Sequence, residues 1–398
     1  MITKKTPYFV VILLFFAFTQ VSYATSDDTR YFVKSTSGWW KKSFGVRHNF
    51  DNGFTSDLTD FQLRVAKIFG VDVEPVKKLN VLPSQSEKSD LSQESIISGK
   101  ARAQRVKPTG QVPWGVKSVY NDPLLSKSSG GLNVNVAILD TGILKTHLDL
   151  KDRIKTCKDF SGPVGIANGK CDDKNGHGTH VAGIIAADGG SDGLGIYGMA
   201  PEANLFVYKV CSNNGTCWAD DIAIALRMAA DDGANVVNMS LGSDSPSQLI
   251  TDATSYAVSK SVLVVAAAGN DGPYVGSIDY PGADSNVVAV GAVDKNIQIP
   301  DWSSRGNNST SIPFVIEEKD IEFAAPGVNV ESTWKDGGYA ILSGTSMAAP
   351  HIAGLAAKEW QKDSLNPASA TRELLQNLTA DLLPIGDDND SGFGFPHL

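Results

Sequence analysis

From about Gln111 onward, apolar residues form short continuous runs that alternate with stretches of helical periodicity. Continuous apolar strands of this kind are typical of a parallel sheet that is covered on both faces by helices, because neither face then meets water. We therefore expect an α/β fold with a mostly parallel sheet. The apolar segments of this pattern are 134–139, 181–187, 205–210, 222–230, 236–241, 262–268 and 287–293.

The preceding region, 25–82, has the pattern of a small α+β unit. Tyr31-Phe32-Val33 predicts the start of a strand, and Gly70 is expected to end a helix. The segment from Val71 to Leu82 predicts a strand that lies at a sheet edge or bulge, because it contains Pro75. The expected helix face consists of Leu58, Phe61, Val65, Ile68 and Phe69, which recur at helical spacing.

The segment 83–107 is rich in Ser, Gln, Glu and Lys and contains no aromatic residue, which is typical of a partly disordered linker. It ends in a basic cluster, for which surface solubility is the simpler explanation. The cluster consists of Lys100, Arg102, Arg105 and Lys107.

The N-terminus predicts a signal peptide, residues 1–24. Two lysines precede an apolar run from Tyr8 to Phe18, and small residues around Ala24 suit cleavage. The run is about half the roughly 20 residues that a spanning helix needs, so we expect no membrane span once it is removed. Export permits disulfides, and we favour Cys157–Cys171 and Cys211–Cys217, because each pair closes a short polar loop. Four free thiols remain the alternative.

Composition excludes some partners. Apolar residues make up 42% of the 398 residues and charged residues 20%, as in ordinary globular proteins. The formal net charge of −9 argues against nucleic acid, because phosphate binding requires a basic surface.

Three polar residues lie at positions typical of catalytic groups. Asp140 ends an apolar strand, His177 lies between glycines at a helix start, and Ser346 follows a Gly-Thr turn at another helix start. They supply an acid, a base and a nucleophile: a serine hydroxyl attacks well only if an imidazole takes its proton and a carboxylate orients that imidazole. Each residue alone has a simple structural explanation, as a turn former, a tolerated histidine or a helix cap.

The letters around these residues carry a family resemblance. Residues 136–142 read VAILDTG, residues 175–183 read NGHGTHVAG, and residues 343–351 read SGTSMAAPH. From Pro113 to about Gly394 the chain resembles the catalytic domain of the subtilisin-like serine proteases (subtilases, peptidase S8). The resemblance implies a subtilisin-like three-layer α/β domain with a mostly parallel sheet, preceded by a small α+β propeptide. It also implies a secreted serine endopeptidase that hydrolyses peptide bonds through an acyl-enzyme.

The resemblance assigns roles to individual residues. Asp140 is similar to the orienting carboxylate, His177 to the general base and acid, and Ser346 to the nucleophile. Asn270, in the segment AAAGN (266–270), resembles the amide of the oxyanion hole. Two rival interpretations remain: a catalytically inactive relative that only binds peptides, and a serine esterase of another class, although Ser346 lacks the Gly-x-Ser-x-Gly elbow.

Substrate binding follows from the same resemblance, because subtilases add an extended peptide to two edge segments. Asp279 precedes Tyr280-Pro281-Gly282, where many relatives have a small residue at the base of the S1 pocket, and Asp271 lies near its rim. Carboxylates there would attract Lys or Arg at P1, unless Asp279 faces solvent or caps a turn. The two edge segments are Ser240, Leu241 and Gly242, and Asn214, Gly215 and Thr216.

Residues 25–107 resemble the propeptide that assists folding and inhibits the enzyme intramolecularly. The expected organisation is a signal peptide (1–24), a propeptide (25–107) with a linker from about 83, and a catalytic domain (108–398). We expect a self-processing precursor that is cut within residues 100–110 and yields a monomer acting on protein or peptide substrates.

A structural calcium site is the expected cofactor site. Asp149 follows Asp140 at the family's spacing for a calcium-binding aspartate, Asp188 begins a segment similar to the ligand loop, and Gln111 lies near the mature N-terminus. Hard oxygen ligands suit calcium. The alternative is an ordinary acidic surface loop.

Overall fold

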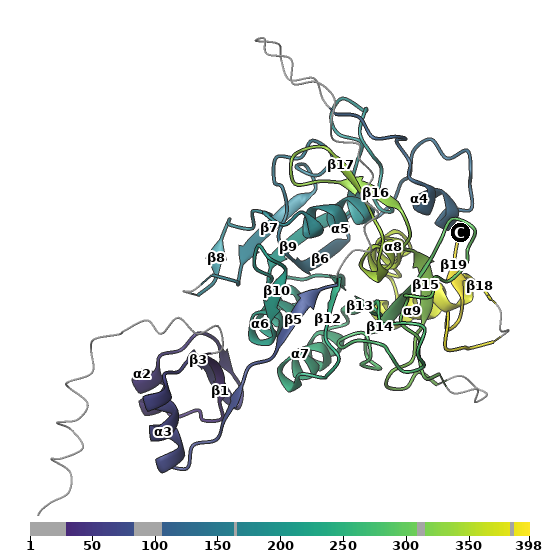
Figure 1. Ribbon diagram of the computed structural model, residues 1–398. Coiled ribbons are helices and arrows are strands. Elements are labelled where there is room, and N and C mark those ends of the chain that lie inside the picture. The colour runs from purple at the N-terminus through teal and green to yellow at the C-terminus, as the bar shows by residue number, and fades with distance from the viewer. Residues whose placement is uncertain (1–28, 83–105, 163–164, 309–314, 383–385) are drawn as a thin grey trace, which may run out of the picture. The chain divides into compact units, whose positions relative to one another are not determined.

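The computed structural model describes residues 29–82, 106–162, 165–308, 315–382 and 386–398. The chain divides into two compact units, Met1–Val76 and Lys77–Leu398, which are described separately (Figure 1). The predicted signal peptide and most of the predicted linker lie outside the described residues.

In the described part of the first unit, an antiparallel sheet of order β2-β3-β1-β4 is accompanied by helices α2 and α3. Tyr31-Phe32-Val33 lies in β1, as predicted, and Pro75 lies in the edge strand β4. The bounds are β1 (Arg30–Val33), α2 (Gly38–Phe44), β2 (Asn49–Phe50), β3 (Gly53–Asp57), α3 (Asp60–Ile68) and β4 (Val73–Pro75).

Helix α3 forms where a helix was predicted, and Leu58 of the predicted apolar face is buried, but three other residues of that face, Phe61, Ile68 and Phe69, are exposed. Phe61 is 52% exposed and Ile68 78% exposed, whereas the buried helix residue is Ala66. The small core of this unit is completed by residues of β1, α2 and β3 and by Leu58, and a capping box between Thr59 and Gln62 fixes the start of α3. Periodicity therefore located the helix but not the side that faces the core.

The larger unit is built on a sheet of order β15-β14-β13-β11-β6-β9-β7-β8, in which every pairing is parallel except β7 with β8. This confirms the predicted mostly parallel sheet. The strands are β6 (Asn135–Asp140), β7 (Ile154–Asp159), β8 (Ala167–Asn168), β9 (Asn204–Lys209), β11 (Val236–Met239), β13 (Leu263–Ala267), β14 (Val288–Val293) and β15 (Phe323–Pro326).

Helices cover this sheet and make a three-layer α/β domain. Helices α5 (His177–Ala186) and α8 (Thr345–Lys358) pack against each other, as do α6 (Ala219–Asp231) and α7 (Gln248–Ser259), and both pairs contact the sheet. The strands β11, β13 and β14 are buried along their whole length, which explains their continuous apolar sequence.

Shorter elements complete the unit. Strand β5 forms a small antiparallel sheet with β10 and β12, β16 pairs with β17, and β18 pairs with β19. Their bounds, with those of two further helices, are β5 (Lys78–Val81), α4 (Trp114–Val119), β10 (Thr216–Trp218), β12 (Leu241–Gly242), β16 (Val330–Thr333), β17 (Tyr339–Leu342), α9 (Pro367–Asn377), β18 (Thr379–Ala380) and β19 (Phe395–Pro396).

All four cysteines are paired, Cys157 with Cys171 and Cys211 with Cys217, which confirms the predicted pairing. The second bridge spans the turn that precedes β10. Among the helices that the structure describes, none is both long enough and apolar enough to cross a bilayer.

Candidate active site

Asp140 and His177 meet where β6 ends and α5 begins. Nδ1 of His177 lies 2.9 Å from Oδ1 and 3.0 Å from Oδ2 of Asp140, and both side chains are buried. Burial disfavours the charged imidazole, but the charge of Asp140 and its hydrogen bond to the ring outweigh burial and raise the pKa of His177. The pair is therefore poised to take up a proton.

Gly178 allows the two elements to approach this closely. A Cβ atom at this position would lie 2.2 Å from the carbonyl oxygen of Gly142, in the turn that follows Asp140. No larger residue fits without moving the backbone. The glycine after His177 is thus required by the contact between α5 and the end of β6.

Ser346 lies in the first turn of α8, which packs against α5. Its hydroxyl donates to the carbonyl oxygen of Ser240 at 3.2 Å, and the Ser240 hydroxyl donates to the carbonyl oxygen of Ser346 at 2.9 Å. Within the described residues, Nε2 of His177 has no hydrogen-bond partner although it is buried. The Ser346 hydroxyl is therefore not hydrogen-bonded to His177 in this structure, and a catalytic contact of this kind often forms only when substrate binds.

Asn270 is held beside the start of α8. Its Oδ1 accepts hydrogen bonds from the backbone N–H of Thr345 at 3.0 Å and from the Thr345 hydroxyl at 3.1 Å. Because Oδ1 is engaged in this way, the plane of the amide is fixed next to Ser346. The structure thus brings all four residues with predicted catalytic roles to the region between β6, α5 and α8.

Asp173 was not singled out from the sequence, yet it links the acid to the base. Oδ1 accepts from the Thr141 hydroxyl at 2.9 Å and the Gly176 N–H at 2.8 Å, and Oδ2 accepts from the N–H and hydroxyl of Thr179. Burial favours the neutral carboxyl, but these hydrogen bonds outweigh burial and lower the pKa of Asp173. The carboxylate therefore ties the residue after Asp140 to the first turn of α5.

We expect Asp173→Asn to lower kcat by about 10²-fold, the order expected for misplaced catalytic groups. The charge of Asp173 also helps to raise the pKa of His177, so its removal should move the acidic limb of the kcat/KM profile to lower pH. The exposed neighbour Asp172 provides a matched control, Asp172→Asn. A purely structural role would lower activity without moving that limb.

The two predicted substrate-binding edges lie on either side of β5. Asn80 is paired with Thr216 of β10 and with Gly242 of β12, both antiparallel, and the N–H of Val81 donates to the carbonyl oxygen of Gly215 at 2.9 Å. Lys77 donates to Ser245 and to the carbonyl oxygen of Pro246. A segment of the chain itself thus takes the extended, edge-paired form of a bound peptide.

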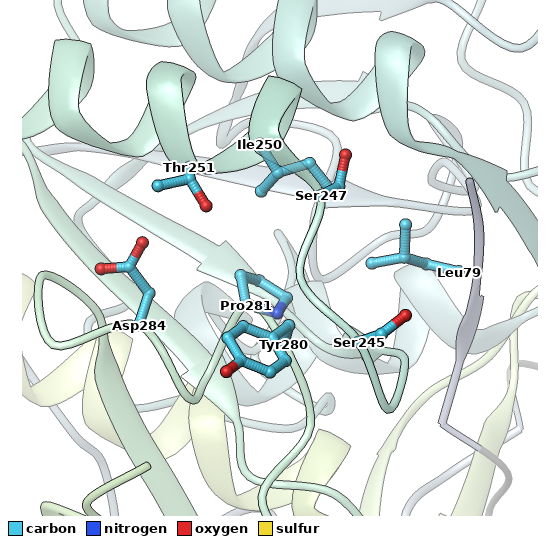
Figure 2. A pocket seen from close by; sticks show the side chains of 8 residues that line it. All are labelled: Leu79, Ser245, Ser247, Ile250, Thr251, Tyr280, Pro281 and Asp284. Atoms are coloured by element: carbon cyan, nitrogen blue, oxygen red, sulfur yellow. The ribbon is translucent and has the colours of Figure 1, made fainter. Parts of the chain in front are cut away.

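Beside this strand lies a pocket, shown in Figure 2, and Leu79 is one of the residues that line it. Leu79 is only 1% exposed, so its side chain gives up almost all of its contact with water. Such a residue contributes about 2 kcal/mol to holding its segment in place. The other lining residues are Ser245, Ser247, Ile250, Thr251, Tyr280, Pro281 and Asp284.

Asp279 lies next to Gly242, in β12, and next to Gly269, which precedes Asn270. A Cβ at Gly242 would be 2.7 Å from its Oδ2, and a Cβ at Gly269 would be 3.0 Å from it. Asp279 is 4% exposed, so it does not face solvent, whereas Asp271 is exposed. Burial, together with the neighbouring carboxylates of Asp271 and Asp244, raises the pKa of Asp279 to about 7.

Two of the predicted calcium ligands point toward one loop. The Gln111 side chain contacts the carbonyl oxygens of Gly193 and Gly195, and Asp149 accepts a hydrogen bond from the N–H of Ile196 at 3.0 Å. Asp188 instead forms an ion pair with Arg153 at 3.1 Å, which engages its carboxylate. Asp149 also accepts a hydrogen bond from the Tyr339 hydroxyl at 2.7 Å, so calcium, which prefers hard oxygen ligands, would have to replace these contacts at the carboxylate.

Comparison with known proteins agrees with this geometry. The sequence model of the Subtilase family matches residues 131–394. The chain is 42% identical over 374 residues to "Subtilisin" of Bacillus sp. (strain TA39). The alignment covers 89% of this chain and 86% of the relative. It is 40% identical over 285 residues to "Subtilisin Savinase" of Lederbergia lenta, covering 71% of this chain and 96% of the relative.

Solved structures give the same result. Two of them, titled "S41 Psychrophilic Protease" and "Sphericase", are each 47% identical to this chain with a TM-score of 0.70. Each match covers 73% of this chain and 99% of the solved chain. The fold and the buried Asp-His pair beside a helix-start serine define a serine hydrolase. The chain belongs to the subtilase family and is a serine endopeptidase of the subtilisin type.

Proposed function

We propose that Ser346 attacks the scissile carbonyl, that His177 takes its proton and passes it to the leaving amine, and that Asp140 orients the imidazole. The observation that carries this assignment is the Asp140–His177 pair: Nδ1 is engaged by the carboxylate, while Nε2 has no partner in the described part of the chain. Burial of the pair strengthens its electrostatic interaction. The acyl-enzyme on Ser346 is then hydrolysed by water through the same steps.

Stabilisation of the oxyanion is assigned to Asn270 and to the backbone N–H of Ser346. The amide of Asn270 is oriented by Thr345, and Ser346 stands at the start of α8, where the helix dipole favours developing negative charge. Preorganised donors of this kind need no reorientation during the reaction.

The protein is proposed to be exported and to carry its own inhibitor. The leader-like residues 1–24 and the two disulfides support export. Strand β5 supports inhibition, because it is paired with both substrate-binding edges. The alignment with the subtilisin of strain TA39 spans 89% of the chain, so it also includes part of the region before the catalytic domain. Cleavage within residues 100–110, at the basic cluster, then yields a secreted monomer.

A preference for Lys or Arg at P1 is the finer part of the proposal. Asp279 is buried below Gly242 and Gly269, where the base of S1 is expected, and Asp271 is nearby. A carboxylate in such a position selects a cationic side chain by charge and hydrogen bonding.

Calcium is proposed as a structural cofactor, held by Asp149, Gln111 and the loop around Gly195. Removing calcium with EDTA is expected to lower Tm by about 5–10 °C, since a ligand present at about 100 times its Kd stabilises by roughly 2.7 kcal/mol. Scanning calorimetry with and without EDTA measures this shift, and Asp149→Asn should remove most of the difference. An unchanged Tm in EDTA would exclude the site.

A fluorophosphonate probe tests the activity directly. We expect it to label Ser346 in the processed enzyme, as mapped by peptide mass spectrometry, and a peptide substrate to protect that residue. Labelling with no peptide hydrolysis but rapid ester hydrolysis would favour an esterase. Absence of both would favour the inactive peptide-binding relative.

A further inference from the structure

Three carboxylates converge next to the proposed S1 position. Ligand oxygens of Asp244, Asp271 and Asp279 all lie within 4.8 Å of one another, so one ion can contact all three. The first two are exposed and the third is buried. Asp244 was not identified from the sequence, because the approach depends on how two loops meet.

The buried member of the cluster lacks a partner. Asp279 is 96% buried, yet no hydrogen-bond donor within the described residues reaches its carboxylate. Its electrostatic neighbours are Asp271 and Asp244, both of which are acidic. An ionised carboxylate in this position is costly unless it is protonated or a cation accompanies it, so the site favours a positively charged ligand.

Backbone contacts hold the cluster in place. Ser243 and Tyr280 exchange two backbone hydrogen bonds, of 3.0 and 2.9 Å, which fix the residues next to Asp244 and Asp279 against each other. The N–H of Asp271 donates to the Ser304 hydroxyl at 3.0 Å. The carboxylates are therefore brought together by the fold and do not meet by chance rotation of free side chains.

We propose that Asp244, Asp271 and Asp279 bind a divalent cation, calcium by the hardness of its ligands, at the S1 position whenever no basic side chain occupies it. One Lys or Arg side chain neutralises a single charge of the three, whereas a divalent ion neutralises two and accepts carboxylate oxygens as direct ligands. The ion and a basic P1 side chain require the same carboxylates, so they exclude each other. This competition rests on the proposed P1 preference; the binding of the ion does not.

Calcium titration of the full-length Ser346→Ala chain tests the site without self-digestion. In isothermal calorimetry, we expect the further change Asp244→Asn to remove one calcium from the binding stoichiometry. The exposed Asp363→Asn serves as the charge-matched control and should change nothing. Asp279→Asn, checked for folding by its melting curve, should reproduce the loss. Equal stoichiometry in all these variants overturns the proposal.

Kinetics tests the competition. Two peptides that differ only in P1, Arg or Leu, are hydrolysed at rising calcium, starting above the concentration that saturates the Asp149 site. At about nine times the Kd of the new site, KM for the Arg peptide should rise about tenfold with kcat unchanged, while the Leu peptide is unaffected. Equal effects on both peptides, or none, overturn the competition.

Failure of the basic-P1 proposal, or of the proposed activity, can be distinguished from failure of the cation site. If Leu at P1 is preferred at every calcium concentration, the basic-P1 proposal fails, while the calorimetric stoichiometry still decides whether the cation site exists. If neither peptide is hydrolysed, the proposed activity fails, and calorimetry again decides the site.

Discussion

Ser346→Ala is expected to abolish peptide hydrolysis and to leave the precursor uncut. In subtilisin itself, a member of this family, loss of the nucleophile lowers kcat by about 2 × 10⁶-fold, and we adopt that magnitude. The physical reason is that the hydroxyl near His177 is the only group proposed to form the acyl bond. Hydrolysis of a peptide substrate measures the first effect, and mass with N-terminal sequence measures the second.

Ser364→Ala, at an exposed serine away from the site, is the matched control and should be processed normally. Wild-type protein should shorten to a start within residues 101–110, whereas Ser346→Ala should retain the segment before it. Normal processing of the alanine variant in pure form would contradict self-cleavage by this serine. A new N-terminus preceded by Leu, Ala or Gln would speak against a basic P1.

Asp279→Asn is expected to reduce the Arg-over-Leu preference at P1 by about 10²-fold at pH 8, the scale of one lost charged hydrogen bond in a buried pocket. The neutral amide keeps the volume of the side chain but not its charge. The measurement is the ratio of kcat/KM for the two peptides. A ratio that does not change would place P1 selection elsewhere.

The same carboxylate predicts a pH dependence. In buffer with EDTA, where no cation occupies the cluster, a pKa of about 7 leaves Asp279 about one tenth ionised at pH 6 and about nine tenths at pH 8, so the preference for Arg should rise about tenfold over this interval. Because the folded-state pKa is raised, ionisation destabilises the fold as pH rises from about 4 to 7. Asp279→Asn should therefore raise Tm at pH 8 and change it less at pH 5.

The sequence predicted the parts of the site that lie at the ends of regular elements. Asp140 closes an apolar strand and Ser346 opens a helix, and their short flanking motifs are fixed by turns and helix starts. Both disulfides were also predicted, because each closes a short loop. These features depend on local chain geometry, which is determined by residues that are neighbours in the sequence.

Contacts between distant segments were not predictable in the same way. Asp173 acts through Thr141 and Thr179, and nothing in the letters around it distinguishes it from the exposed Asp172. Asp244 comes close to the carboxylates of Asp271 and Asp279 because the residue before it, Ser243, pairs with Tyr280. The face of α3 was misjudged because Phe61 and Ile68 have apolar side chains but remain exposed.

Strand β5 has a consequence for the timing of activation. Its register pairs Val81 with Leu241 and Asn80 with Gly242, so the strand occupies the β12 edge at which a substrate peptide is expected to pair. The strand is held by its backbone pairing and by the buried side chain of Leu79. For each 1.4 kcal/mol by which the binding free energy of the strand is weakened, its affinity for the groove falls about tenfold. We therefore expect the strand to delay the enzyme until a peptide that binds the same two edges more tightly displaces it.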